Sequence, residues 1–335
     1  MQKLHIAKKY PLSKKWLDIE PFEDVTIINS IKVFLNGFCV KNHQQMAVTA
    51  SAGSLKNNSK DRAYFELIER SSIVEYDINK QKKLTITNIN KSLSEKIPSS
   101  DIFPTPINPE KWRYARSNGV AVHTSWKKAC ENAFHELFER DTILRSWYGE
   151  ICPQKISLPK SLIPSSWNSL YHFEAYDFPR PGLLKTSMVI GYPKRNKIPL
   201  IYGFSAKTTK LSSLKSALQE CIQRLGFLWG EDLPHTPPSF SPTPDFHQEY
   251  FLYPPNIKLL KSWLSGSHTK YYSHSKKQSL TNLKPLFLDL TPPHLKGKLF
   301  VVKAYSPTAI PLIFGQKKIA EDSTLPKELF IHPIA

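Results

Sequence analysis

Apolar residues recur three and four positions apart in three stretches of the chain, which is the spacing of one face of an α-helix. This pattern predicts three helices, over about 61–75, 126–147 and 212–229. Thr124 or Ser125 suits the N-cap of the second helix, because a hydroxyl oxygen can accept the unpaired backbone N–H groups there. Each helix is therefore expected to have a buried side and a polar side.

Runs of β-branched and aromatic residues predict strands on both sides of these helices. Short strands are predicted at 25–28, 31–34, 84–86, 286–290 and 299–304. The clearest hairpin joins 184–191 to 198–205 across a basic turn, whereas 151–182 is expected to be loops with a short strand. We therefore expect an α+β fold with repeated βα units and helices packed on mixed sheets.

Seven prolines lie between residues 234 and 255. That density predicts a linker or a wrapped loop without regular structure. A chain of 335 residues can form one large domain or two of ordinary size. We expect a single domain over 1–335, with this Pro-rich loop at about 234–255 and a C-terminal tail at about 325–335.

Composition narrows the class of protein. Apolar residues make up 40% of the chain and aromatic residues 12%, which favours a folded protein over a disordered one. No apolar run is long enough to span a membrane and no signal peptide is evident, so the cytoplasm is the expected compartment and no membrane partner is expected. The four cysteines form no CxxC pair, so neither a zinc site nor a redox motif is indicated.

The net charge of +18 favours anionic partners such as nucleotide phosphates, an acidic peptide or nucleic acid. The lysines are spread along the chain, however, and no nucleic-acid-binding motif is present. Nucleic acid is therefore not the expected main partner.

The polar sides of the three predicted helices carry one repeated pattern: an acid, two apolar residues, an acid or amide, and an arginine. The three copies are Glu66-Leu67-Ile68-Glu69-Arg70, Glu136-Leu137-Phe138-Glu139-Arg140 and Glu220-Cys221-Ile222-Gln223-Arg224. A loop containing Gly and Ser is expected before each helix, at Ser51-Ala52-Gly53, Ser117-Asn118-Gly119 and Gly203-Phe204-Ser205. The glycine precedes the first acid by 17 positions in the second and third copies and by 13 in the first. We interpret these segments as three copies of one loop–helix unit around one site.

Two glutamates three positions apart lie on one face of a helix. A single such pair is typical of a solvated helix face. If the first two helices face each other, however, four carboxylates gather, those of Glu66, Glu69, Glu136 and Glu139. Such a cluster repels itself unless cations occupy it, and its oxygen ligands suit Mg²⁺. The third copy has Gln223 in place of the second acid, so the whole set predicts a site for metal and triphosphate. Neither a P-loop nor a protein-kinase motif is present.

These segments resemble the YcaO family. Residues 117–141 are similar to its second nucleotide-binding motif, in which an S-N-G loop leads to E-x-x-E-R-D. Residues 51–70 resemble the first motif, 203–224 the third, and 301–315 the late strand with its Pro-containing turn. The closing residues His-Pro-Ile-Ala resemble the proline-rich C-terminus of members that modify peptides. The resemblance covers nearly the whole chain in the family's order.

The resemblance implies a YcaO-type fold with three motif-bearing helices around an ATP and Mg²⁺ site. The implied magnesium ligands are Glu66, Glu69, Glu136 and Glu139. The implied nucleotide-binding residues are Ser51, Gly53, Arg70, Ser117, Asn118, Thr124, Lys128, Arg140, Glu220, Gln223 and Arg224. The implied catalytic group is the C-terminal carboxylate of Ala335.

Three functions stay open within this resemblance. The leading one is a cyclodehydratase that uses ATP to convert Cys, Ser or Thr of a ribosomally made peptide to an azoline. The second is a thioamide-forming member that uses sulfide. The third is a non-catalytic accessory factor for another modification system, such as one acting on a ribosomal protein, because Arg62 stands where the first motif usually has Ser and residues 225–232 lack the arginine that commonly follows Gln223.

The resemblance also bears on partners. A peptide or protein substrate is expected. The chain has room for little beyond a YcaO domain, so a separate leader-peptide-binding or accessory protein is expected as well. Whether the chain forms a homodimer is left open.

Overall fold

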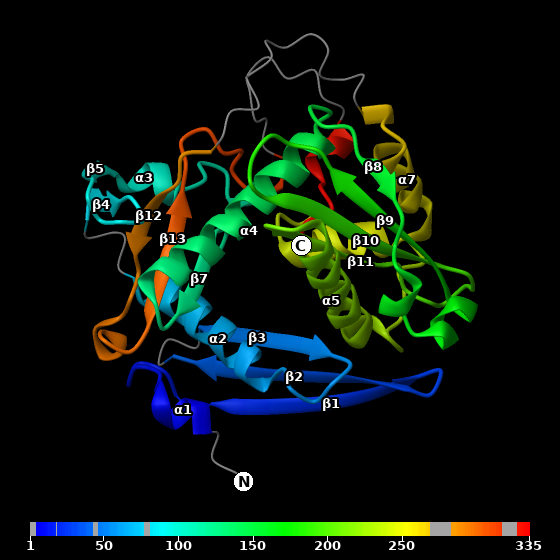
Figure 1. Ribbon diagram of the computed structural model, residues 1–335, viewed down its shortest axis with the longest axis horizontal. Coiled ribbons are helices and arrows are strands. Elements are labelled where there is room, and N and C mark those ends of the chain that lie inside the picture. Colours follow the sequence, from blue (N-terminus) through cyan, green and yellow to red (C-terminus); the bar gives the residue numbers. More distant parts are fainter. Residues whose placement is uncertain (1–4, 18, 43–45, 77–80, 269–282, 317–326) are drawn as a thin grey trace. The chain divides into compact units, whose positions relative to one another are not determined.

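A computed structural model describes residues 5–17, 19–42, 46–76, 81–268, 283–316 and 327–335 (Figure 1). The chain divides into two compact units, each assembled from three stretches. Unit 1 comprises Met1–Phe103, Arg116–Leu137 and Lys284–Pro307, and unit 2 comprises Pro104–Ala115, Phe138–Leu283 and Thr308–Ala335. The assignment of 1–335 to one domain stays a prediction, and residues 325–326 of the expected tail lie outside the described residues.

The first sheet of unit 1 has three antiparallel strands, β1 (Glu20–Ile28), β2 (Ile31–Lys41) and β3 (Ala47–Ser54). Helix α2 (Lys60–Glu75) packs on this sheet, and the short α1 (His5–Lys9) precedes it (Figure 1). The buried side of α2 is the apolar stripe read from the sequence, and it joins the core with Phe38, Val40 and Ala50 of the sheet. The predicted helix over 61–75 and the strands around it are confirmed.

The second sheet of unit 1 has five strands in the order β5-β4-β12-β13-β7. Their bounds are Lys83–Thr87 for β4, Ser94–Pro98 for β5, Val120–His123 for β7, Leu286–Asp289 for β12 and Phe300–Tyr305 for β13. Short helices lie nearby in the chain at α3 (Ser99–Ile102) and η6 (Pro293–Leu295). Strand β7 leads into α4 (Trp126–Trp147), whose bounds match the prediction.

Unit 2 contains a four-stranded sheet in the order β11-β10-β9-β8. Its strands are β8 (Gln154–Ile156), β9 (Tyr171–Phe178), β10 (Lys185–Pro193) and β11 (Ile201–Lys207). Strands β10 and β11 form the predicted hairpin, and α5 (Lys210–Leu228) packs against both of them (Figure 1). The stretch 151–182 is more regular than expected, because β9 pairs along eight positions with β10.

The remaining elements of unit 2 include a two-stranded ribbon of β6 (Trp112–Tyr114) and β14 (Ile313–Gly315). The helices are α6 (Pro244–Leu252) and α7 (Ile257–Leu264), with short 3₁₀ turns at Lys160–Leu162, Ser165–Ser169, Pro254–Asn256 and Lys327–Phe330. The large aromatic side chains of Trp147, Phe178 and Trp263 meet in the core of this unit.

The prediction that 234–255 has no regular structure is wrong for its second half, where α6 forms. Pro244 occupies the first turn of that helix, where a missing backbone N–H costs no hydrogen bond. The Thr243 side chain caps the helix by accepting the Phe246 N–H at 3.2 Å. Proline density therefore marked a helix start as well as a loop.

The α+β class is confirmed, and so are the βα units, because β3, β7 and β11 are each followed by a motif helix. The pairings between the described strands are antiparallel rather than mixed, since hairpins join neighbours such as β1 to β2 and β10 to β11. Among the described helices, none combines the length and apolar character that crossing a membrane requires.

Candidate active site

The first motif copy lies on α2 of unit 1, on the face turned from its apolar stripe. The Ser51 N–H of β3 donates to Glu66 Oε2 at 3.3 Å. Arg70 forms an ion pair with Glu66 at 2.6 Å and donates to the Thr49 carbonyl at 2.8 Å. Strand β3 and the arginine therefore fix the direction of the Glu66 carboxylate.

Glu69, one turn further along α2, is a strongly perturbed acid. The Val122 N–H of β7 donates to its Oε1 at 2.8 Å. Loss of water around the carboxylate raises the pKa of Glu69 well above its ordinary range, and the negative charges of Glu136 and Glu66 raise it further. The carboxylates of Glu66 and Glu136 are thus close enough to Glu69 to act on it.

Helix α4 carries the second copy and crosses the division between the units, so that Glu136 belongs to unit 1 and Glu139 to unit 2. Glu139 is buried, and the Ala206 N–H of β11 donates to its Oε2 at 3.1 Å. Arg140 Nε donates to the other carboxylate oxygen at 3.2 Å. Burial raises the pKa of Glu139, and the positive charges of Arg140 and Lys207 oppose that rise.

The third copy lies on α5 of unit 2. The Phe204 N–H of β11 donates to Glu220 Oε2 at 3.1 Å, and the Arg224 guanidinium lies 4.0 Å from the ring centroid of Tyr202. Gly203 permits this close approach of strand and helix, because a Cβ there would lie 2.3 Å from the Ala217 carbonyl oxygen.

One arrangement recurs in all three copies: a backbone N–H of a neighbouring strand holds a motif glutamate. The donors are Ser51, Val122, Phe204 and Ala206, and the acceptors are Glu66, Glu69, Glu220 and Glu139. The prediction that Ser51–Gly53 and Gly203–Ser205 are loops is therefore wrong. Both segments are strand, β3 and β11, because extended backbone is what presents an N–H to the carboxylate at each site.

The S-N-G turn before β7 is a genuine turn. Gly119 has φ of 69°, a conformation that favours glycine. Asn118 is buried and Ser117 is exposed. The turn is held from β13, where the Ala304 N–H donates to the Gly119 carbonyl at 2.8 Å.

Lys303 is a site residue that the sequence interpretation missed. Its buried Nζ donates to the carbonyls of Arg116 at 3.0 Å and Asn118 at 2.6 Å. Burial lowers the pKa of Lys303 to about 8, and the charge of Glu136 opposes the decrease. The signal was available: Lys303 is the one charged residue in the apolar strand Phe300–Tyr305.

The remaining predicted nucleotide residues of unit 1 lie at its surface. Thr124 is exposed at the start of α4, and Lys128 forms an exposed ion pair with Glu131 at 2.8 Å. Arg62, which replaces the usual Ser of the first motif, donates to the Gly53 carbonyl at 2.6 Å. Arg62 therefore supports the end of β3.

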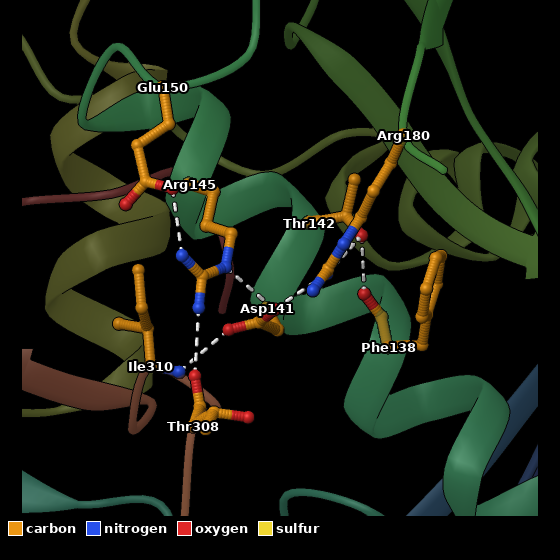
Figure 2. A network of polar contacts seen from close by, with 8 residues as sticks. All are labelled: Phe138, Asp141, Thr142, Arg145, Glu150, Arg180, Thr308 and Ile310. Carbon is orange, nitrogen blue, oxygen red and sulfur yellow. Dashed lines mark hydrogen bonds and ion pairs between the residues drawn. The ribbon is translucent and has the colours of Figure 1, made fainter. Parts of the chain in front are cut away.

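Asp141 is the last residue of the second motif, directly after Arg140, and is the centre of a buried polar network in unit 2 (Figure 2). Its Oδ2 accepts from Arg145 Nε at 2.9 Å and from Arg180 Nη1 at 2.6 Å. Its Oδ1 accepts the Ile310 N–H at 2.6 Å. Arg145 also donates to Glu150 at 2.7 Å and to the Thr308 carbonyl at 2.8 Å. The network thus ties the middle of α4 to the segment that precedes β14.

The donor chemistry of the motif acids fits a magnesium ion. Hard carboxylate oxygens are what Mg²⁺ prefers, and a cation would relieve the mutual repulsion that raises the pKa of Glu69. Among the described residues, no group of three or more His, Cys, Asp or Glu side chains is placed so that it could hold a metal ion by itself. Mg²⁺ usually keeps several waters and shares phosphate oxygens in addition to one or two carboxylates.

Comparison with protein families matches residues 97–309 to the family described as YcaO cyclodehydratase, ATP- and Mg²⁺-binding. The matched region is more than half of the chain, and the chain belongs to the YcaO family. ATP and Mg²⁺ are the cofactors of that family. A search of curated protein sequences finds no match.

Solved structures share the fold. YcaO from Methanopyrus kandleri bound with AMPPCP and Mg²⁺ is 15% identical, with a TM-score of 0.61 over 87% of this chain and 85% of that one. The E. coli microcin synthetase McbBCD complex with pro-MccB17 bound contains a chain that is 14% identical, with a TM-score of 0.61 over 94% of this chain and 96% of that one. A heterocyclase in complex with substrate and cofactor is 15% identical, with a TM-score of 0.55 over 93% of this chain and 52% of that one.

Proposed function

We propose that this protein is an ATP- and Mg²⁺-dependent enzyme that activates a peptide backbone amide by O-phosphorylation and converts Cys, Ser or Thr to an azoline. The observation that carries the proposal is the state of Glu69. Burial raises its pKa, and the neighbouring carboxylates of Glu136 and Glu66 raise it further, an arrangement that costs stability unless a cation is bound. Membership of a family that binds ATP and Mg²⁺ identifies the cation.

The proposed magnesium ligands are Glu66, Glu69, Glu136 and Glu139. Backbone N–H groups already orient three of them, Glu66, Glu69 and Glu139. Such orientation reduces the reorganisation needed when the ion binds.

The proposed nucleotide-binding groups are those named from the motifs: Ser51, Gly53, Arg70, Ser117, Asn118, Thr124, Lys128, Arg140, Glu220, Gln223 and Arg224. Arginine and lysine side chains among them suit phosphate oxygens. We assign Lys303 to the same site. Its role is to hold the S-N-G turn in place, since both of its carbonyl acceptors belong to that turn.

ATP would supply the phosphoryl group that turns the amide oxygen, a poor leaving group, into phosphate, a good one. The chain's own task is to hold the phosphates and to accept the proton released when the side-chain nucleophile attacks the amide carbon. We assign that proton to the C-terminal carboxylate of Ala335, because the residue is exposed and a carboxylate can act as a general base.

The proposed substrate is a ribosomally made peptide, delivered by a separate leader-binding or accessory protein in the cytoplasm. Support comes from the relatives: the E. coli synthetase is a complex of several proteins with pro-MccB17 bound, and the heterocyclase is a complex with its substrate.

The proposal is tested by ATP hydrolysis. The wild-type protein should hydrolyse ATP slowly in Mg²⁺, and Glu69→Gln and Glu139→Gln should each lower the rate by at least about 100-fold. Asp61→Asn is the matched control, because Asp61 is an exposed acid of α2 outside the pattern Glu66–Arg70, and it should keep the wild-type rate. A wild-type protein that neither binds nor hydrolyses ATP would instead be an accessory factor.

Mass spectrometry of a peptide incubated with the protein, its partner and ATP decides the product. Loss of one water per modified residue is expected for an azoline. Replacement of one oxygen by sulfur in the presence of sulfide would instead identify a thioamide-forming enzyme.

A further inference from the structure

The outer edge of β14 carries an unusual set of hydrogen-bond partners. One edge of this strand pairs with β6. On the other, the Ile313 carbonyl accepts from His332 Nε2 at 2.9 Å, and the Gly315 N–H donates to His247 Nε2 at 3.0 Å. Two imidazoles therefore satisfy the strand edge where another strand could have paired.

A third hydrogen bond closes this set. His247 Nδ1 lies 3.0 Å from the His332 carbonyl oxygen. Because His247 Nε2 accepts the Gly315 N–H, it carries no proton, and His247 must donate to that carbonyl through Nδ1. His332 in turn must carry its proton on Nε2 to donate to Ile313. The bonds thus require His247 to be neutral with its proton on Nδ1, and they require a proton on Nε2 of His332.

The surroundings keep the rings neutral. Both are fully buried, and their centroids are 4.4 Å apart. Burial lowers the pKa of both, that of His332 to about 4, and the positive charge of Arg140 also disfavours a charged His332. The effect of Arg140 also shows that the tail lies near the second motif within unit 2.

The segment that the two histidines hold is the C-terminal tail. Trp147 Nε1 of α4 donates to the Leu329 carbonyl at 2.7 Å. The side chains of Leu329, Ile331 and Ile334 pack in the core of unit 2. Every residue from Leu329 to Ile334 is buried, and Ala335 alone is exposed.

We propose that His247 and His332 are positioning residues that lock the C-terminal tail onto β14 and so present the Ala335 carboxylate at a fixed point of unit 2. Ala335 follows His332 by three residues, so release of the ring would free the carboxylate. The docking of the tail follows from the hydrogen bonds described above and does not depend on the proposed function. The effect of docking on catalysis rests on the proposed function.

Carboxypeptidase Y digestion of the full-length protein, followed by intact mass, tests the docking. His247→Phe and His332→Phe keep an aromatic ring but remove its hydrogen bonds. His268→Phe is the matched control: His268 is another buried histidine of unit 2, with its ring nitrogen 3.1 Å from the Trp147 carbonyl oxygen. Wild type and His268→Phe should lose Ala335 and then resist, whereas the two tail variants should be trimmed past Ile331.

His332→Gln retains a side-chain N–H donor and should restore much of the resistance. If a Phe variant does not fold, the Gln variant at the same position takes its place, with a smaller effect expected in the same direction. Trimming of both tail variants that stops where wild type stops would overturn the proposal.

The catalytic consequence has its own readout. In ATP hydrolysis, both tail variants should lower kcat by at least about tenfold with KM for ATP unchanged, as should deletion of Ala335 alone. A change in KM instead of kcat would show that the tail does not position a reacting group. If wild type hydrolyses no ATP, the proposed function fails, while the digestion still decides whether the histidines hold the tail.

Discussion

Removal of the Asp141 carboxylate should be one of the most damaging single changes in unit 2. Asp141 and the Arg180 side chain are almost completely buried, with exposed fractions of 0% and 1%. Asp141→Ala would leave Arg180 with one described hydrogen bond, from Nη1 to Thr142 Oγ1 at 3.0 Å, because its Nε and Nη2 find no hydrogen-bond partner among the described residues.

The expected cost follows from these contacts. Breaking a buried ion pair by removing one partner costs about 3–5 kcal/mol, and loss of the acceptor of the half-buried Ile310 N–H adds about 1 kcal/mol. We expect the free energy of unfolding to fall by at least about 4 kcal/mol, a large part of the total for an ordinary domain. Arg145 keeps Glu150 and the Thr308 carbonyl, so it does not add a second unpaired charge.

Urea denaturation followed by tryptophan fluorescence measures this change, because Trp147, Trp167 and Trp263 are buried in unit 2. Asp177→Asn is the control, since the Asp177 ion pair with Lys210 spans 3.8 Å and is partly exposed, and it should cost less than about 1 kcal/mol. Asp141→Ala combined with Arg180→Met removes the unpaired buried cation and should recover part of the loss.

Two results would refute this reasoning. One is a loss for Asp141→Ala that lies within about 1 kcal/mol of the control. The other is a double variant no more stable than Asp141→Ala. If Asp141→Ala does not fold, Arg180→Met alone still decides. Asp141 keeps its hydrogen bonds from Arg145 and the Ile310 N–H in that variant, so the cost should lie below the roughly 3–5 kcal/mol of a buried charge left without a partner.

Three further predictions use the same structure. Glu69→Gln should make the Mg²⁺-free protein more stable at neutral pH, because ionisation of an acid whose pKa is raised in the folded state destabilises the folded protein. Thermal unfolding should also show that Mg²⁺ raises the Tm of wild type but not of this variant. A Glu69→Gln protein that is less stable than wild type without Mg²⁺ would contradict the repulsion between the carboxylates. Gly203→Ala should lower the free energy of unfolding by about 1–3 kcal/mol and separate β11 from α5, because the added Cβ would collide with backbone atoms of α5. An unchanged urea midpoint would mean that strand and helix adjust without cost. Burial lowers the pKa of His332 to about 4, in a site that also faces His247 and Arg140. As the pH falls, His332 is therefore protonated in the unfolded state before it is protonated in the folded state, and the folded protein loses stability. The urea midpoint should decrease as the pH is lowered from about 7 to about 4, and it should decrease less steeply in His332→Gln.

The helices and the β10–β11 hairpin could be predicted because their signals are local. The apolar stripe of α2 and the bounds of α4 follow from spacing within one segment. The acids of the motifs were found for the same reason. The hydrogen bonds from strands to the motif acids were not local signals. Ser51–Gly53 and Gly203–Ser205 looked like loops because they contain small residues, yet both segments are strand, and Gly203 lets α5 approach β11 closely.

The contacts that the sequence could not supply join distant positions. Asp141 meets Arg180 across 39 positions and Ile310 across 169, and His247 meets His332 across 85. Each of these residues is an ordinary polar side chain in its own segment. Lys303 lies between these cases, because a lysine within an apolar strand did indicate a buried charge, although not its acceptors in the S-N-G turn.

The most direct test of the central claim is the affinity for ATP measured by calorimetry with Mg²⁺ and with EDTA. If the motif carboxylates hold Mg²⁺ against the phosphates, wild type should bind ATP at least about tenfold more tightly in Mg²⁺, a coupling of about 1.4 kcal/mol. Glu69→Gln should lose that difference and Asp61→Asn should keep it. Equal affinity of wild type for ATP with and without Mg²⁺ would contradict the account.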